Sequence, residues 1–208
     1  GRVQSAGALK ATRGSDGGIV VVDGGAEGLA EVGGTVDVSG VAGVGGSVLV
    51  TGEKVVVMEN SHLLADGDTG GGNLRIGGGI RGEEQAFQNA NSTRIGNGAM
   101  LSADARWVGD GGLVVSFAEN ELFYDGFASA KGGSQSGNGG FIELSGKQTV
   151  EFPSVTHLGD TSAVNGHFGT LLIDPTNIDV VPDQYEGPTS GLVITNQAIS
   201  TNLVTNNV

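Results

Sequence analysis

The chain has 208 residues, of which 40 are glycine, 4 are proline and 38% are hydrophobic, so it can form a core and is not a low-complexity linker. Its formal net charge of −13, with only 10 scattered Lys and Arg, excludes nucleic acid as an expected partner. The lack of cysteine excludes disulfides and thiolate chemistry, and no apolar run approaches the ~18 residues of a membrane-inserted helix.

A glycine pair followed by a short apolar segment recurs along the chain. The pairs begin at positions 17, 45, 71, 111 and 139, and a copy with one glycine begins at Gly169, giving intervals of 28, 26, 40, 28 and 30 residues. The period is therefore about 28 residues, and the 40-residue interval carries an insertion. A helical repeat of this length would need runs of good helix formers, which this Gly-, Val- and Thr-rich chain lacks.

Within each copy, alternate residues after the glycines are apolar, which predicts strands with one buried face. The second positions are Val20, Val48, Leu74, Val114, Ile142 and Leu171. The fourth positions are Val22, Val50, Ile76, Ser116, Leu144 and Ile173, where only the serine is polar. The residues between them are mixed, so the other face is expected to be partly solvated.

Each repeat continues with two more short strands. We expect them at residues 54–58 with 62–67, 121–124 with 127–130, and 149–152 with 155–158, and we assign residues 35–39 to the third strand of the opening coil. Three strands per ~28 residues predict an all-β protein, a parallel β-helix of about six coils in which residues 1–208 form one body. The glycines are expected at corners that need positive φ or close backbone approach.

Two stretches carry a family resemblance. The run GGFIELSGK at positions 139–147, followed by GTLLIDPTNI at positions 169–178, resembles the signature of filamentous-haemagglutinin-like exoproteins exported by two-partner secretion. Residues 111–117, 125–126 and 128–133 resemble a preceding coil of that family, and Ala198-Ile199-Ser200 resembles the opening of a following coil. The resemblance extends from about Gly33 to Val208.

The resemblance implies a right-handed parallel β-helix from a secreted protein of the bacterial cell surface, with roles in adhesion, biofilm formation or contact-dependent competition. It implies a host-cell or matrix surface, or a polysaccharide, as partner, and an outer-membrane transporter that exports the parent chain. The family's amino-terminal secretion domain is not recognised, so this segment is not expected to engage the transporter itself. Residues 114–118 also lack the tryptophan that the family carries near this strand end.

The ends of the chain carry further expectations. The start at Gly1 without methionine suggests a segment of a longer protein. No caps are evident at the two end coils, so exposed strand edges predict end-to-end self-association. Residues 174–190, which contain Asp174-Pro175, are expected to form an irregular connection between coils.

The insertion is expected at residues 79–93, as a loop that projects from the solenoid. Projecting loops commonly carry recognition, so its charged, amide and aromatic residues are the candidate ligand-binding residues: Arg81, Glu83, Glu84, Gln85 and Phe87. The alternative is a lid that packs Phe87 against the solenoid.

The acidic residues of the chain offer candidate catalytic and metal sites. The carboxylate pairs Asp66 with Asp68, Glu83 with Glu84, and Glu119 with Glu121 could in principle cut polysaccharide, but turn chemistry explains the first pair, and we expect no enzyme, no catalytic residue and no cofactor. Calcium at the corner residues Asp66, Asp68, Asp110 and Asp160 would have too few oxygen ligands for tight binding, so these are interpreted as solvated turn residues and no metal site is predicted.

The histidines and large aromatic residues carry weaker signals. His62, His157 and His167 lie far apart in the sequence and lack metal-site spacing. Trp107, Tyr124 and Phe152 could stack on sugars, although core or corner packing is the expected role. The sequence therefore favours a structural and adhesive stalk; the alternatives are a carbohydrate-binding module, using residues 81–87 or the outward face of a sheet, and a polysaccharide-degrading enzyme.

Overall fold

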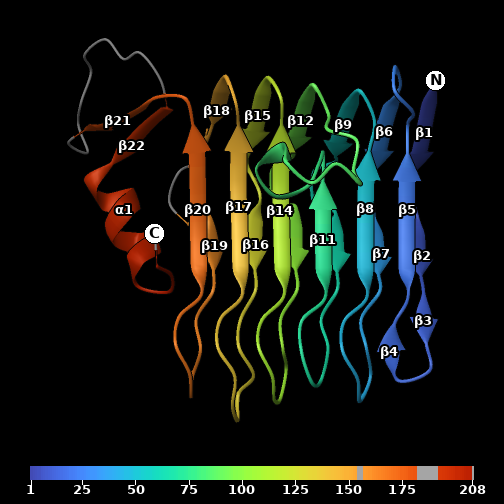
Figure 1. Ribbon diagram of the computed structural model, residues 1–208, viewed down its shortest axis with the longest axis vertical. Helices are drawn as coiled ribbons and strands as arrows, with labels where there is room; N and C mark the ends of the chain where they lie inside the picture. The colour runs from blue at the N-terminus through green and yellow to red at the C-terminus, as the bar shows by residue number, and fades with distance from the viewer. Residues whose placement is uncertain (154–156, 182–191, 208) are drawn as a thin grey trace.

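The computed structural model describes residues 1–153, 157–181 and 192–207. Three six-stranded sheets, all with parallel strand pairing, wind around one core, and each coil contributes one strand to each sheet (Figure 1). The predicted parallel β-helix of about six coils is confirmed. We call the sheets 1, 2 and 3 in the order in which the chain first enters them.

The strands are short and recur in the same order. Sheet 1 contains β1 (Arg2–Ser5), β6 (Leu29–Val32), β9 (Lys54–Val57), β12 (Ser92–Ile95), β15 (Glu121–Tyr124) and β18 (Thr149–Glu151). Sheet 2 contains β2 (Ala8–Lys10), β7 (Thr35–Asp37), β10 (His62–Leu64), β13 (Met100–Ser102), β16 (Phe127–Ser129) and β19 (Gly159–Asp160). Sheet 3 contains β5 (Ile19–Asp23), β8 (Ser47–Thr51), β11 (Asn73–Ile76), β14 (Leu113–Ala118), β17 (Phe141–Gly146) and β20 (Thr170–Pro175).

The winding is right-handed. In Figure 1 the strands of sheet 3 face the viewer and run upward, the chain crosses over the top to the two sheets behind, and successive coils are displaced from the N-terminus on the right toward the C-terminus on the left. Outside the three sheets lie a hairpin of β3 (Thr12–Arg13) and β4 (Asp16–Gly17), a short 3-10 helix η1 (Ile80–Gly82), and a C-terminal unit of β21 (Ile178–Val181), β22 (Leu192–Thr195) and α1 (Asn196–Leu203).

The core is a stack of aliphatic ladders, because parallel pairing without slippage places equivalent residues of successive coils above one another. In sheet 3 the strand register aligns one predicted inward row, which consists of Val20, Val48, Leu74, Val114, Ile142 and Leu171. All of these except the partly buried Val20 are buried. The prediction that alternate apolar residues of these strands face the core is therefore confirmed.

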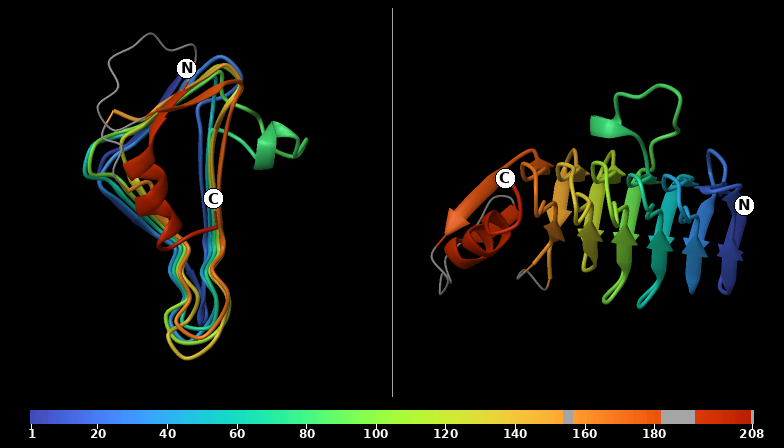
Figure 2. Two further views of the ribbon diagram at one scale, coloured as in Figure 1. Left: turned by 90° about the vertical axis from the view of Figure 1, so that its left-hand side faces the viewer. Right: turned by 90° about the horizontal axis from the view of Figure 1, so that it is seen from below.

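The glycine pairs sit where sheet 2 passes to sheet 3 through a narrow lobe, seen at the bottom of Figure 2, left. A Cβ atom on Gly71 would lie 1.9 Å from the carbonyl oxygen of Ala103, and one on Gly72 would lie 2.1 Å from that of Gly46. The N–H of Gly72 also donates to the carbonyl of Ala65 at 2.7 Å, across the neck of the lobe. Close backbone approach, and not positive φ, therefore requires glycine in these pairs.

The C-terminal end is covered, contrary to the expected uncapped coil. Ala198, Ile199 and Ser200 lie in α1 and do not open a strand, and α1 begins after Thr195, whose side chain accepts a hydrogen bond from the backbone N–H of Ala198 at 3.2 Å. Figure 1 and Figure 2, right, show α1 at the end of the stack.

Side chains and backbone both fix this cap. The amide of buried Asn206 accepts from the backbone N–H of Thr161 at 2.7 Å and donates to the carbonyl of Gly159 at 2.8 Å. Asn207 pairs with the edge of β20 through Leu171 N–H at 2.9 Å. At the other end, β1, β2 and β5 have no further strand paired to their outer edges among the described residues. The exposed strand edges predicted for both ends are therefore found at the N-terminal end, and end-to-end association is expected there.

Several predicted boundaries were wrong by a few residues. The strand expected at residues 155–158 is found as β19 at Gly159–Asp160, and residues 154–156 lie outside the described part. In the 174–190 connection, β20 continues through Pro175 at the free edge of its sheet and β21 begins at Ile178, while residues 182–190 lie outside the described residues. The insertion runs from residue 77 to 91, because Ser92 and Thr93 already pair with β9.

Candidate functional site

The insertion, residues 77–91, leaves the solenoid at the corner between sheets 3 and 1 and extends beside sheet 3 (Figure 2). Its backbone uses unusual conformations: Gly77, Gly78 and Gly82 have positive φ, and so does Arg81 at 53°. Glycine tolerates this region, whereas arginine adopts it at a cost. The surrounding contacts must hold the loop in place.

The loop residues chosen from the sequence divide into two groups. Arg81, Glu83 and Gln85 are exposed. Glu84 and Phe87 turn back to Arg75 on β11: Glu84 pairs with the guanidinium at 3.1 Å, and that guanidinium lies 4.7 Å from the centre of the Phe87 ring. The hydrogen bond from Arg75 lowers the pKa of Glu84 below its ordinary value, with help from the N–H of Ile80.

The loop acts as a lid over part of sheet 3. Val115 and Phe117 of β14 are buried although they lie outside the core cluster. A Cβ on Gly82 would lie 2.3 Å from Cζ of Phe117, so the loop backbone rests directly on the ring. Asn89 ties the loop down by donating to the carbonyl of Gly82 and to Glu119, each at 2.8 Å.

The lid also buries Glu143 of β17, which sequence reasoning did not select. Its Oε1 accepts a hydrogen bond from the backbone N–H of Arg81 at 2.8 Å, while Oε2 has no partner among the described residues. Burial raises the pKa of Glu143, and the charge of nearby Asp174 acts in the same direction. The sequence places Glu143 in the outward-facing row of sheet 3, which also contains the apolar Val115. That mixture was the only sign in the sequence that part of this face is covered.

The corner aspartates accept hydrogen bonds from backbone N–H groups, in most cases of a neighbouring coil, and are not merely solvated. Asp68 accepts from the N–H of Ala42 at 2.8 Å, and Asp110 accepts from that of Asn138 at 2.7 Å. Asp160 accepts from Ser162 within its own turn at 2.8 Å. Within the described ranges, no group of three or more His, Asp or Glu is arranged to hold a metal ion.

A related ladder joins successive coils below sheet 2. Asp66 accepts from the Ser102 hydroxyl at 2.6 Å and from the N–H of Asp104 at 2.9 Å. Asp104 in turn accepts from the Ser129 hydroxyl at 2.6 Å and from the N–H of Lys131 at 2.7 Å. Each carboxylate therefore fixes the next coil to its own.

The three carboxylate pairs lie in different settings. Asp66 and Asp68 both contact Arg106, at 3.7 and 3.4 Å. Glu119 bonds Asn89 and Lys147 near the lid, whereas Glu121 lies exposed on sheet 1. In the third pair, Glu84 is held by Arg75, whereas Glu83 forms no ion pair with any described residue.

The aromatic platform considered from the sequence does not form. Tyr124 and Phe152 are buried and stack edge to face with centroids 6.1 Å apart, while Trp107 is 56% exposed. The ring centroids of His157 and Phe127 lie 5.0 Å apart. His62 lies on another strand, β10 of sheet 2.

The fold places the molecule among the right-handed parallel β-helices. One similar solved structure is the secretion domain of HMW1 from Haemophilus influenzae, with a TM-score of 0.65 and 23% sequence identity over 83% of this chain and 45% of that chain. The likeness is one of fold, and this chain spans less than half the length of that chain. No family model and no curated protein matches the sequence. No helix in the described residues is long and apolar enough to cross a membrane.

Proposed function

We propose that the chain is a structural and adhesive segment of a secreted bacterial surface exoprotein: a stiff β-helical stalk that carries the lid loop at its side. The observation that carries the proposal is the uninterrupted stack of three hydrogen-bonded sheets around one aliphatic core. Such a body extends by adding coils, each of which buries the face of the one before.

Two further features support the proposal. A protein named as a secretion domain has the same fold, which agrees with export of the parent chain through an outer-membrane transporter. The proposed role is not catalytic, because Asp66, Asp104 and Glu119 are engaged in holding the coils and the lid together. The charge of −13 favours solubility of an extended surface protein.

Adhesion through the loop is tested with a variant that keeps the lid closed. Arg81→Asn, Glu83→Ala and Gln85→Ala change only exposed side chains, and asparagine tolerates positive φ at position 81. The matched control changes the same residue types at exposed positions at the far end of the solenoid: Arg13→Asn, Glu27→Ala and Gln4→Ala. Attachment of the purified chain to host cells and matrix-coated surfaces is measured for all three proteins.

We expect the loop variant to lose attachment and the control to retain it, with no change in the surface glycans. Attachment by neither the wild type nor the variants would place the adhesive residues outside the loop and leave the stalk role. Release of reducing ends or unsaturated sugars from a polysaccharide would contradict the proposal and support an enzyme.

A second candidate function is carbohydrate binding by the loop. The outward position of Arg81, Glu83 and Gln85 favours it, since charged and amide groups can hydrogen-bond sugar hydroxyls. Saturable binding to a glycan array that the loop variant loses, and the control keeps, would separate this function from a purely structural one.

A further inference from the structure

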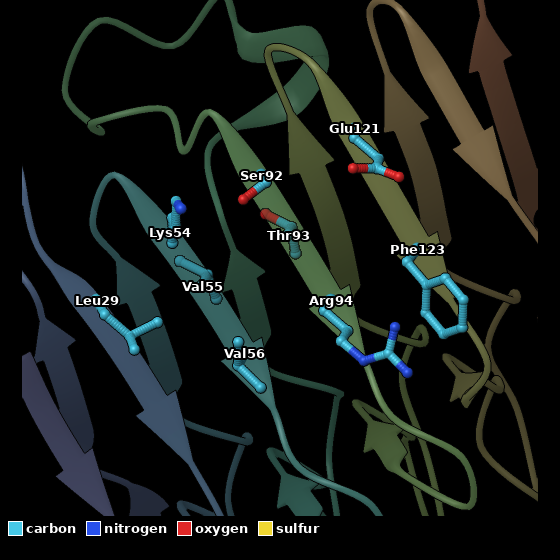
Figure 3. Close-up of a pocket in the computed structure, with 9 residues that line it drawn as sticks. All are labelled: Leu29, Lys54, Val55, Val56, Ser92, Thr93, Arg94, Glu121 and Phe123. Carbon is cyan, nitrogen blue, oxygen red and sulfur yellow. The ribbon is translucent and has the colours of Figure 1, made fainter.

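A shallow depression lies on the outer face of sheet 1, away from the lid. Its outward-facing lining comes from four successive coils, with Leu29 on β6, Lys54 and Val56 on β9, Ser92 and Arg94 on β12, and Glu121 and Phe123 on β15 (Figure 3). Strand alternation turns these seven side chains outward, and none of them is buried. The depression is therefore open to a ligand.

Arg94 is held in a defined position on this face. It is the strand-to-strand neighbour of Phe123, and its guanidinium carbon lies 3.7 Å from the centre of the phenyl ring, as Figure 3 shows. Within the described residues this guanidinium makes no hydrogen bond or ion pair, so its five N–H donors remain available. The stack orients the donors before any ligand binds.

The depression holds two basic side chains that form no ion pair in the described part of the chain, beside the carboxylate of Glu121. Six of the ten Lys and Arg form ion pairs, namely Arg2, Lys10, Arg75, Arg106, Lys131 and Lys147. The remaining four, unpaired in the described part of the chain, are Arg13, Lys54, Arg81 and Arg94, and two of these line the depression. Lys54 and Arg94 are diagonal neighbours on adjacent strands, about 8 Å apart along the backbone grid.

The chemistry of the face selects the ligand class. A planar guanidinium binds a carboxylate through two parallel hydrogen bonds, and the aliphatic surface of Leu29 and Val56 suits the C–H face of a sugar ring. Glu121 and Glu151 flank Arg94 and Phe123 on the same face and would repel a dense polyanion. A ligand with carboxylates separated by neutral units meets both conditions.

We infer that the outer face of sheet 1 binds an acidic polysaccharide with widely spaced carboxylates, one carboxylate lying between Arg94 and Lys54 and the neighbouring sugar ring on Val56 and Leu29. This inference goes beyond the stalk role and uses no residue of the lid loop. Its failure would leave the proposed function untouched, because the two are measured with different variants.

The test is calorimetric titration of the intact chain with an oligosaccharide of alternating uronic acid and neutral hexose units. Three further probes are its carboxyl-reduced form, a densely sulfated oligosaccharide and poly-glutamate. We expect Arg94→Ala to weaken binding of the first probe by about tenfold or more, and Arg94→Lys to weaken it as well because the fork is lost. Phe123→Leu should weaken it less, since the guanidinium loses only its orientation.

The matched control is Arg13→Ala, which removes one exposed, unpaired positive charge from the β3–β4 hairpin. We expect Arg13→Ala and the loop variant to bind as the wild type, and reduction of the carboxyls to abolish binding. Unchanged binding by Arg94→Ala, an equal loss with Arg13→Ala, or no binding of the first probe would overturn the inference. Equal or tighter binding of the sulfated probe or of poly-glutamate would overturn the assignment to a sparse carboxylate glycan.

Discussion

The backbone N–H of Arg81 donates a 2.8 Å hydrogen bond to Oε1 of Glu143, which lies 62 residues later in the chain and two coils further along the solenoid. This contact joins the strained point of the lid to a buried carboxyl on sheet 3. The lid therefore spans β11, β14 and β17, and one of its contacts is a hydrogen bond to a buried carboxyl.

Glu143→Gln should stabilise the protein above the ordinary glutamate pKa of 4.5. The raised pKa means that the folded state binds the proton more tightly, so the wild type loses stability as pH rises from 4.5 through the folded pKa. Glutamine keeps an acceptor for Arg81 and removes the buried charge, and we expect a gain of about 1 kcal/mol at pH 7. The gain should shrink toward zero below pH 4.5.

Thermal unfolding of both proteins across this pH range measures the effect. Glu121→Gln, at an exposed position, is the control and should change little. A lower stability of Glu143→Gln at pH 7 would show that the carboxylate charge holds the lid closed.

Ser116→Ala should also stabilise the fold. Ser116 is fully buried in the inward ladder between Ile76 and Leu144, and its hydroxyl has no partner among the described residues. Removing an unsatisfied buried hydroxyl should gain about 1 kcal/mol.

The same substitution at Ser129, equally buried but bonded to Asp104 at 2.6 Å, should cost about 1 kcal/mol. Chemical denaturation of the two variants measures both signs. Equal effects at the two positions would contradict the assignment of their hydroxyls.

Gly112→Ala should prevent folding or destabilise it by more than about 3 kcal/mol. A Cβ there would lie 2.0 Å from the carbonyl oxygen of Gly72 on the neighbouring coil, and backbone cannot move aside locally. Gly7→Ala is the control, because a Cβ on Gly7 meets nothing within 4 Å. Soluble yield and melting temperature are the measurements, and a well-folded Gly112→Ala would refute the close approach in the lobe.

Asn206→Ala should open the C-terminal cap. The amide makes hydrogen bonds to Thr161, Gly159 and Asn202 in a buried position, so its loss should cost about 2–3 kcal/mol. An exposed edge of β19 and β20 should then promote association.

Sedimentation velocity at rising concentration measures that association. Asn165→Ala, which removes a single exposed hydrogen bond to Ser134, should leave both stability and association unchanged. Head-to-tail polymers of the wild type would show that the cap does not protect this end.

Much of the fold could be predicted because every coil of a solenoid repeats the same strands with the same face buried. The apolar alternation in Leu74 and Ile76 is enough to fix strand and face, and stacking copies of one coil leaves little freedom in topology. The predictions failed where the repeat stops. Ala198 resembles the start of another strand, yet the Thr195 cap and the contacts of Asn206 place it in a helix.

The lid shows the same division. Its existence follows from one interval that is too long, and the sequence offered Arg81, Glu83, Glu84, Gln85 and Phe87 as its candidate ligand-binding residues. Their partners Arg75 and Glu143 could not be paired with them from the sequence, because loops follow no period and their contacts depend on neighbouring coils.

The sequence by itself determined the coil, its inward ladders and its glycine positions, since each follows from periodic side-chain alternation and from close backbone approach. Only the tertiary structure decided that the loop closes over Glu143, that Asn206 caps the last coil, and that Arg94 and Lys54 share one face and form no ion pair among the described residues. These relationships join residues on different coils or outside the repeat, and distance in space, not spacing in sequence, sets their energies.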